Sequence, residues 1–258
     1  MTKIAMTGGG GRVGKYLQKE GVIPLVCDVT KPQQVNDTVS KERPDFIIHL
    51  AALSDIDYCQ QPENQQEVID VNLRGTFNVL ASAEMYNAKV VMISSDHIFS
   101  GNEVFKWSPY KENDKPNPVN FYGQSKLAAE ALQKTFPEIK IVRTSYLFDE
   151  ERLVRKENES QPSFILRSFM YLPHFVSNLM EYLNRWDEMP SILHISGNRT
   201  VSWYKFMGEY LGDINIKHHD REIYSTKNAP RPHRAGLSTK YPNLLPAYNY
   251  RDGFEAMK

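Results

Sequence analysis

Short apolar runs alternate with amphipathic segments through the first 150 residues of the chain. Strand-like runs occupy residues 3–7, 44–52, 89–95 and 139–143, and residues 22–30 hold at most one short strand, ending at Asp28. Helical periodicity appears over residues 33–43, 62–83 and 122–136. Strands and helices that alternate in this way predict an α/β fold, with a doubly wound parallel sheet covered by helices on both faces.

The pattern changes after Asp149. Residues 150–162 are charged and predict a mobile loop, followed by a helix at 175–186, a short strand at 192–195 and a helix at 202–211 that Ser202 caps. The tail from Pro230 onward is rich in Pro, Tyr and Arg and is expected to wrap the surface. We therefore predict a main domain at 1–149, and a reduced lobe and tail at 150–258 from which some segments return to the main sheet.

Composition narrows the class of protein. The 258 residues contain 31 Lys+Arg and 31 Asp+Glu, a balance that gives no support to nucleic-acid binding. The two cysteines, Cys27 and Cys59, lack metal-ligand spacing. No stretch resembles a signal peptide or a membrane span. We expect a cytoplasmic protein without a metal, a membrane or a nucleic-acid partner.

A glycine-rich loop joins the first strand to the first helix. Gly8, Gly11 and Gly14 give the spacing Gly-x-x-Gly-x-x-Gly. Such a loop lets the backbone approach a pyrophosphate and directs helix N-terminal N–H groups at it. The alternative is a flexible turn, but its place between strand and helix favours a Rossmann-type dinucleotide site.

The carboxyl ends of the predicted strands bring further polar groups to the same edge. In doubly wound sheets ligands bind outside these ends, so Ala51, Ala52, Ser94 and Ser95 are expected beside the glycine loop. The Ser95 hydroxyl can donate a hydrogen bond to a carbonyl or alkoxide oxygen. The alternative is a strand-end serine that satisfies its own backbone.

Tyr122 and Lys126 stand four residues apart at the start of a predicted helix, and therefore on one face of it. A phenol has a free pKa of about 10, and a nearby cation favours its ionised form. Tyr122 is thus a candidate general acid. Alone, the pair also fits an exposed Tyr/Lys pair.

Together these motifs resemble the extended short-chain dehydrogenase/reductases, and within them the dTDP-4-dehydrorhamnose reductase group. The resemblance covers the first 150 residues nearly continuously and the last part sparsely. The residues that carry it are Thr7, Gly8, Gly11, Gly14, His49, Ala51, Ala52, Val71, Asn72, Ser94, Ser95, Asp96, Phe99, Gly101, Pro109, Glu112, Pro118, Tyr122, Lys126, Arg143, Ser145, Arg231 and Pro232.

The resemblance implies a small C-terminal substrate-binding lobe and a role for each matching residue. Tyr122 is the expected acid, Lys126 lowers its pKa and holds the nicotinamide ribose, and Ser95 completes the catalytic set. The expected cofactor-binding residues are Gly8, Gly11, Arg12, Val13, Gly14, Asp28, Val29, Ala51, Ala52, Asn72, Ser94, Tyr122 and Lys126. The expected substrate-binding residues are Ser95, Asp96, His97, Tyr122 and Arg231.

Some positions depart from the family pattern. His97 stands where the family has Tyr, so it either alters substrate recognition or is packed. Asp28 follows Gly8 by the spacing of an NAD-selecting acid, although its context is that of an adenine-contacting residue. Arg12 can pair with a 2′-phosphate and favours NADP(H) over NAD(H). Arg231 and Arg234 are candidates for a nucleotide diphosphate, or solvated surface residues.

The predicted function is NAD(P)H-dependent reduction of a nucleotide-linked 4-keto-6-deoxy sugar, by a protein that can form a homodimer. One alternative is an epimerase or dehydratase of the same superfamily. A dehydratase is expected to carry an Asp-Glu pair near Ser95, where this chain has Asp96 and His97. Another alternative is a non-catalytic NADP-binding regulatory subunit, like that of methionine adenosyltransferase. The shortened C-terminal lobe is compatible with this alternative.

Overall fold

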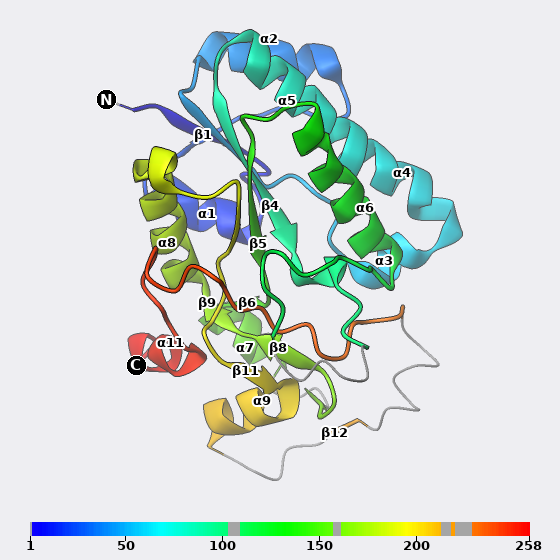
Figure 1. Ribbon diagram of the computed structural model, residues 1–258, viewed down its shortest axis with the longest axis vertical. Helices are drawn as coiled ribbons and strands as arrows, with labels where there is room; N and C mark the ends of the chain where they lie inside the picture. Colours follow the sequence, from blue (N-terminus) through cyan, green and yellow to red (C-terminus); the bar gives the residue numbers. More distant parts are fainter. Residues whose placement is uncertain (1, 103–108, 157–160, 213–217, 220–228) are drawn as a thin grey trace. The chain divides into compact units, whose positions relative to one another are not determined.

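A six-stranded sheet forms the centre of the computed structural model, which describes residues 2–102, 109–156, 161–212, 218–219 and 229–258 (Figure 1). Its strand order is β10-β5-β4-β3-β1-β2, and β1 pairs in parallel with both β2 and β3, as β3 does with β4. The strands are β1 (Ile4–Thr7), β2 (Ile23–Pro24), β3 (Phe46–His49), β4 (Lys89–Ser95), β5 (Lys140–Thr144) and β10 (Ile192–His194). This sheet confirms the α/β prediction.

The strand order reverses at β1, with β2 on one side and β3 on the other. Because crossovers between parallel strands are right-handed, the reversal assigns α1 to one face and the following helices to the other. The helices of this part are α1 (Arg12–Lys19), α2 (Pro32–Glu42), α3 (Ile56–Gln60), α4 (Gln65–Ile69), α5 (Thr76–Met85) and α6 (Phe121–Glu130). A π-helical turn at Asp70–Gly75 joins α4 to α5.

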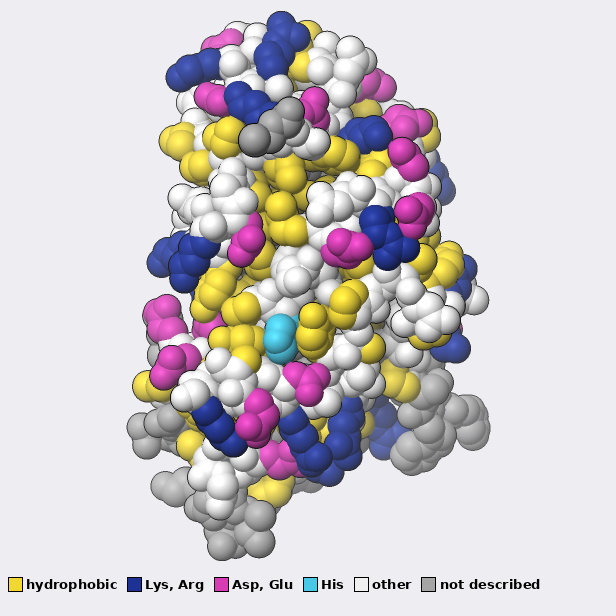
Figure 2. All heavy atoms as spheres, turned by 90° about the vertical axis from the view of Figure 1, so that its left-hand side faces the viewer, with side chains coloured by type: hydrophobic (Ala, Val, Ile, Leu, Met, Phe, Trp, Pro, Cys, Tyr) yellow, Lys and Arg dark blue, Asp and Glu magenta, His cyan; other side chains and the backbone are white. Residues whose placement is uncertain are grey.

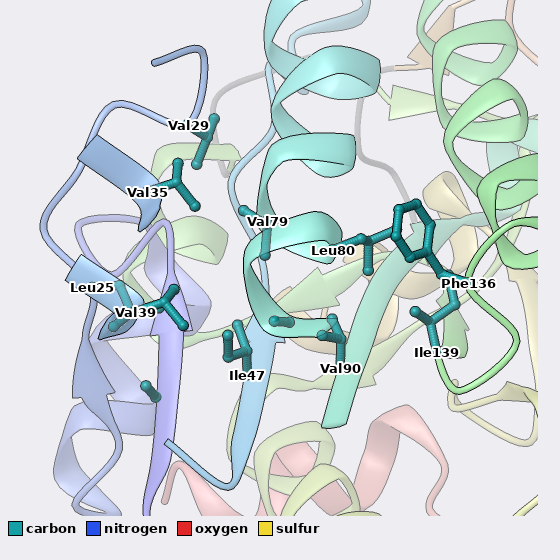
Figure 3. Close-up of a cluster of buried hydrophobic side chains, with 12 residues drawn as sticks. Leu25, Val29, Val35, Val39, Ile47, Val79, Leu80, Val90, Phe136 and Ile139 are labelled. Carbon is teal, nitrogen blue, oxygen red and sulfur yellow. The ribbon is translucent and has the colours of Figure 1, made fainter. Parts of the chain in front are cut away.

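An aliphatic core lies between the sheet and the helices α2 and α5 (Figure 3). Residues of α2, such as Val35 and Val39, meet residues of α5, such as Val79 and Leu80, over the strand residues Ile47 and Val90. All are at most 2% exposed. At about 25 cal/mol per Å² of buried apolar area, such packing dominates the stability of this part.

The chain forms two compact units. The first unit comprises residues 1–94, 121–142 and 187–192, and the second comprises residues 95–120, 143–186 and 193–258. The elements of the second unit are β6 (Leu147–Phe148), α7 (Glu150–Lys156), β7 (Gln161–Pro162), β8 (Leu166–Ser168), β9 (Met170–Tyr171), α8 (Leu172–Asn184), β11 (Thr200–Ser202), α9 (Trp203–Leu211), β12 (His218–His219) and α11 (Tyr250–Ala256). Its core is aromatic: Phe169 stacks on Phe206 with ring centroids 4.0 Å apart, and Tyr250 packs against Phe206.

Two predictions about local structure are wrong, and one short helix was not predicted. The strand at 22–30 ends at Pro24 rather than Asp28, because Pro24 cannot continue a ladder and Val26 is 85% exposed. Residues 150–156 form the helix α7 rather than a loop, with the Asp149 carboxylate accepting the N–H of Arg152. The short helix α3, which the Asp55 side chain caps, was not predicted.

The tail does not simply wrap the surface. Ala235, Leu237 and Tyr250 are each at most 1% exposed. The Ser168 hydroxyl donates to the carbonyl of Leu237 and also accepts the Leu237 N–H. These apolar side chains are core residues of the second unit. The Pro- and Arg-rich composition of the tail did not predict their burial. Between β4 and α6, Phe99 stacks on Tyr110 with ring centroids 4.2 Å apart.

Candidate active site

The glycine loop is built by close backbone approach at the point where the strand order reverses. Gly8 has φ +70°, and a Cβ there would lie 2.8 Å from the Ala51 nitrogen. A Cβ on Gly14 would lie 2.6 Å from the Gly9 carbonyl oxygen. Gly11 caps α1, whose first-turn N–H groups have no side-chain cap. A reversal point of this kind is where doubly wound folds bind dinucleotides.

A buried histidine fixes the loop that follows β3. The Nδ1 of His49 lies 2.7 Å from the Thr7 hydroxyl, and its Nε2 lies 2.9 Å from the Thr76 hydroxyl. Because Thr76 donates its own proton to the Asn72 carbonyl, it must accept from Nε2–H, so the neutral ring carries its proton on Nε2. Burial, assisted by the charge of Lys126, lowers the pKa of His49 to about 3.

Helix α6 carries the predicted acid and its cation. Lys126 is 4% exposed, and burial lowers its pKa to about 8, opposed by Glu130. The Ser125 hydroxyl donates to the Tyr122 carbonyl and accepts from the Asn72 amide. This chain of bonds ties the first turn of α6 to the π-helical turn, a feature common at functional sites.

Asn72, predicted to bind cofactor, also clamps the loop after β3. Its side-chain oxygen accepts the N–H of Leu53, and its amide donates to the Leu53 carbonyl. Both amide protons are therefore used within the protein, the second by Ser125. Asn72 thereby links the loop that contains Ala51 and Ala52 to the helix that contains Tyr122.

The first unit fits a dinucleotide. At Gly8 and Gly14 a Cβ would clash with backbone, so glycine is required for the tight turn that shapes this loop. The Ser94 hydroxyl, at the end of β4, is buried and has no hydrogen-bond partner among the described residues. A polar group in this state has hydrogen-bonding capacity that a water or a ligand can fill. No group of His, Cys, Asp or Glu suited to a metal occurs in the part of the chain that the structure describes.

The remaining predicted cofactor residues have unequal environments. Arg12 and Val13 begin α1 and are half-buried, and Ala52 is also half-buried. Asp28 is exposed, and hydrogen bonds from Thr30 lower its pKa. Val29 contributes its side chain to the aliphatic core, and its carbonyl accepts from Asn78 (Figure 3).

The predicted substrate residues Ser95, Asp96 and His97 open the second unit. The Ser95 hydroxyl accepts the His97 N–H at 3.2 Å and donates to Oδ1 of Asp96, also at 3.2 Å. Burial raises the pKa of Asp96, against the opposing effect of Arg167, whose Nε lies 3.2 Å from Oδ2. All three side chains are at most 8% exposed.

His97 is held as a neutral ring. The Asn120 amide donates both to Nδ1 of His97, at 3.0 Å, and to the Pro230 carbonyl, at 2.8 Å. Only an amide nitrogen can donate to that carbonyl, so Nδ1 is the acceptor and Nε2 carries the proton. Burial and the charges of Arg167 and Arg231 keep the pKa of His97 well below its usual value.

Three polar residues lack a sequence signal of their own. Asn120, Ser125 and Arg167 reach their partners across 23, 53 and 71 residues of chain respectively. Their residue types are common, and nothing in local spacing marks them. Arg231, which the motif did indicate, donates to the Ala229 carbonyl and lies near His97.

Charged side chains are intermingled on the face shown in Figure 2, without an extended area of one sign among its described residues. Within the described part of the chain, no helix is both long and apolar enough to cross a membrane.

Two curated proteins are similar to this chain over most of its length. The spore coat polysaccharide biosynthesis protein SpsK of Bacillus subtilis (strain 168) is 27% identical over 259 residues, which cover 92% of this chain and 89% of that protein. A dTDP-4-dehydrorhamnose reductase of Aggregatibacter actinomycetemcomitans is 26% identical over 231 residues, covering 80% of this chain and 77% of the relative.

Solved structures show the same fold over the full length. The dTDP-4-dehydrorhamnose reductase of Bacillus anthracis str. Ames, in complex with NADP, has a TM-score of 0.88 and 26% identity, covering 100% of this chain and 99% of that one. An ortholog from Clostridium acetobutylicum ATCC 824 has a TM-score of 0.85 at 22% identity, covering 99% and 98%. The model of the RmlD substrate binding domain matches residues 2–252, and the chain therefore belongs to that family.

Proposed function

We propose that this protein is an NAD(P)H-dependent reductase of a nucleotide-linked 4-keto-6-deoxy sugar, with NADPH as its preferred cofactor. The relatives named dTDP-4-dehydrorhamnose reductase, one of them in complex with NADP, support this activity. The observation that carries the proposal is the buried Lys126 ammonium one helical turn from Tyr122, on a helix tied by Ser125 and Asn72 to the loop after β3.

The cofactor is held by the first unit. The uncapped first turn of α1 and the open glycine loop receive the pyrophosphate. Ser94 supplies a hydroxyl whose hydrogen-bonding capacity is otherwise unused by the described residues. Lys126 donates to the nicotinamide ribose. When bound, the nicotinamide supplies the hydride that reduces the sugar carbonyl.

Tyr122 gives its phenolic proton to the keto oxygen of the sugar as the carbonyl is reduced. The Lys126 ammonium stabilises the phenolate that remains, which lowers the cost of this transfer. Ser95 hydrogen-bonds the same substrate oxygen and fixes its position. Protonated Lys126 is therefore the active form, and that form predominates below a pH of about 8 in the free protein.

Substrate recognition falls to the second unit. Neutral His97 presents Nε2–H as a donor suited to a sugar hydroxyl or carbonyl oxygen, where the family pattern has Tyr. The guanidinium of Arg231 is suited to the nucleotide diphosphate. This donor, together with Ser95 and Asp96, makes the second unit the proposed determinant of which sugar is reduced.

Preference for NADPH rests on Arg12 and Asp28. Arg12 begins α1, where a guanidinium can pair with a 2′-phosphate. An acid that selects NAD follows the second strand in this fold, but Asp28 stands four residues beyond the end of β2, and Thr30 donates to its carboxylate. Arg12→Ser is expected to weaken NADPH binding about tenfold, and NADH binding little.

Oxidation of NADPH and NADH with a panel of dTDP-, UDP- and GDP-linked 4-keto-6-deoxy sugars tests the activity. Tyr122→Phe should lower kcat by about 10²- to 10⁴-fold while NADPH still binds. Tyr86→Phe, at the end of α5, is the matched control and should keep normal turnover.

Absence of turnover with every sugar, together with equal NADPH binding by wild type and Tyr122→Phe, would contradict the proposal. It would favour the non-catalytic regulatory alternative, which co-purification with a synthetase partner would then support. A product altered in configuration, with no net cofactor oxidation, would indicate an epimerase.

A further inference from the structure

The second unit contains a buried ion pair that sequence reasoning did not assign. Arg167, on β8, is 5% exposed, and Asp96, just after β4, is 3% exposed. The Nε of Arg167 lies 3.2 Å from Oδ2 of Asp96. Burying two charges costs several kcal/mol per ion unless geometry and further hydrogen bonds repay it. The pair is therefore expected to serve a purpose besides stability.

The two oxygens of the Asp96 carboxylate face different partners. Oδ2 accepts from Arg167 and, at 2.7 Å, from the Ser145 hydroxyl. Oδ1 receives the hydroxyl proton of Ser95 at 3.2 Å. One side of the carboxylate is thus anchored, and the other side holds the serine predicted to act on the substrate.

Arg167 is itself anchored on two further segments. Its Nη1 donates to the Pro232 carbonyl at 2.8 Å and to the Leu166 carbonyl at 2.9 Å. The guanidinium thus joins β8 and the tail to the residue that follows β4. Because its planar fork has a fixed geometry, the position of Asp96 is determined by the fold of the unit rather than by its own rotamer freedom.

From this geometry we propose that Arg167 is a positioning residue for the reductase reaction, acting through Asp96 to fix the position of the Ser95 oxygen. The inference rests on the proposed function. The Asp96 carboxylate and the His97 N–H hold this oxygen in place, and the hydroxyl proton turns from Asp96 to the keto oxygen when substrate binds. The Ser95 oxygen is then fixed before substrate arrives, which lowers the entropy lost in reaching the reactive geometry.

The test is a double-mutant cycle on kcat between Arg167→Lys and Ser95→Ala. Arg167→Lys keeps the positive charge but loses the fork, and it should lower kcat about tenfold in the wild-type background with little change in KM. In the Ser95→Ala background the same change should lower kcat less than twofold, because Ser95 is no longer there to be positioned. Ser145→Ala, which removes the other anchor of Oδ2, should show the same dependence on Ser95 and is the milder variant if Arg167→Lys folds poorly.

Arg143 supplies the matched control, because it is 3% exposed and lies in the same unit, donating to the Glu112 carbonyl. Arg143→Lys should lower Tm, and any effect on kcat should be equal with and without Ser95.

Equal effects of Arg167→Lys in both backgrounds would overturn the inference, as would a raised KM with unchanged kcat, which would mean direct substrate binding. An inactive wild type would overturn the proposed function and this inference together, whereas an active wild type with an additive cycle overturns the inference alone.

Discussion

The two units bury polar groups in different ways. We call a buried side chain that hydrogen-bonds two or more groups a hub. In the first unit the hubs are neutral: His49 bonds two threonine hydroxyls, and Asn72 bonds the backbone N–H and carbonyl of Leu53. In the second unit the hubs are charged. Asp96 meets Arg167, and the Glu112 carboxylate accepts from the His194 N–H, the Thr239 hydroxyl and the Lys240 N–H.

This difference matters for both stability and chemistry. Truncation of a neutral hub removes hydrogen bonds between neutral groups, whereas truncation of a charged hub leaves donors without their charged acceptor. In the first unit the buried charged side chains Lys126 and Glu130 both lie on α6. In the second unit, buried charged side chains hold together segments that are far apart in sequence, such as those containing residues 96 and 167.

Truncation of one hub in each unit provides the largest contrast. Glu112→Ala is expected to lower the free energy of unfolding by about 4 kcal/mol, because three donors, among them the buried His194 N–H, lose a charged acceptor. Asn72→Ala is expected to cost about 2 kcal/mol. Denaturant unfolding of both variants and wild type measures the two costs, and equal values would remove the distinction between the units.

The glycine loop offers the next largest effect. Gly14→Ala places a Cβ 2.6 Å from the Gly9 carbonyl oxygen, so backbone must move. We expect NADPH affinity to fall about 100-fold, equivalent to about 3 kcal/mol. Gly10→Ala is the control, since nothing lies within 4 Å of the added Cβ. Titration by NADPH fluorescence measures both, and similar affinities in the two variants would contradict the role of the loop.

Acidification should destabilise the first unit through His49. Its pKa is about 3 in the folded protein and about 6.5 when unfolded, so below pH 6.5 the unfolded chain binds the extra proton and stability falls with pH. The expected loss between pH 7 and pH 5 is about 2 kcal/mol. His49→Gln removes this contribution, although His97, whose pKa is also lowered, keeps its own. Wild type and His49→Gln with equal pH dependence would show that the ring is not held neutral.

Alkaline pH should weaken cofactor binding through Lys126. Its pKa of about 8 means that the ammonium loses its proton as the pH rises from 8 to 9, so NADPH affinity should fall at most about tenfold over that interval. Lys126→Arg keeps its charge throughout and should show a flat profile. A titration series from pH 7 to pH 9.5 measures both. A flat profile in wild type would contradict a required ammonium with this pKa.

Local spacing was sufficient to predict the alternation of strands and helices in most of the first unit. Gly8, Gly11 and Gly14, and the pair Tyr122 and Lys126, lie within a few residues of their partners, so strand and helix periodicity places them. The same reasoning failed at Asp28, because Pro24 ends β2 early and leaves an exposed turn. A two-residue strand is too short for an apolar pattern to define its end.

Local spacing was insufficient for the second unit. Arg167 and Asn120 act through partners that only the folded chain brings near, and neither residue type is unusual at its position. Helix α7 was missed because its charged residues show no apolar stripe, and its Asp149 cap was not recognised. The buried Leu237 lies in a Pro- and Arg-rich tail whose composition suggested a surface segment.

The most direct test of the reductase function is isotope transfer. NADPH carrying two deuterium atoms at the reactive carbon of the nicotinamide, incubated with a dTDP-linked 4-keto-6-deoxy sugar, should yield a sugar nucleotide with one deuterium on the former keto carbon. Mass spectrometry and NMR of the product measure this. Deuterated product formed by wild type and lost in Tyr122→Phe is the expected result. A product without deuterium, or no product from a protein that binds NADPH, would contradict the proposed function.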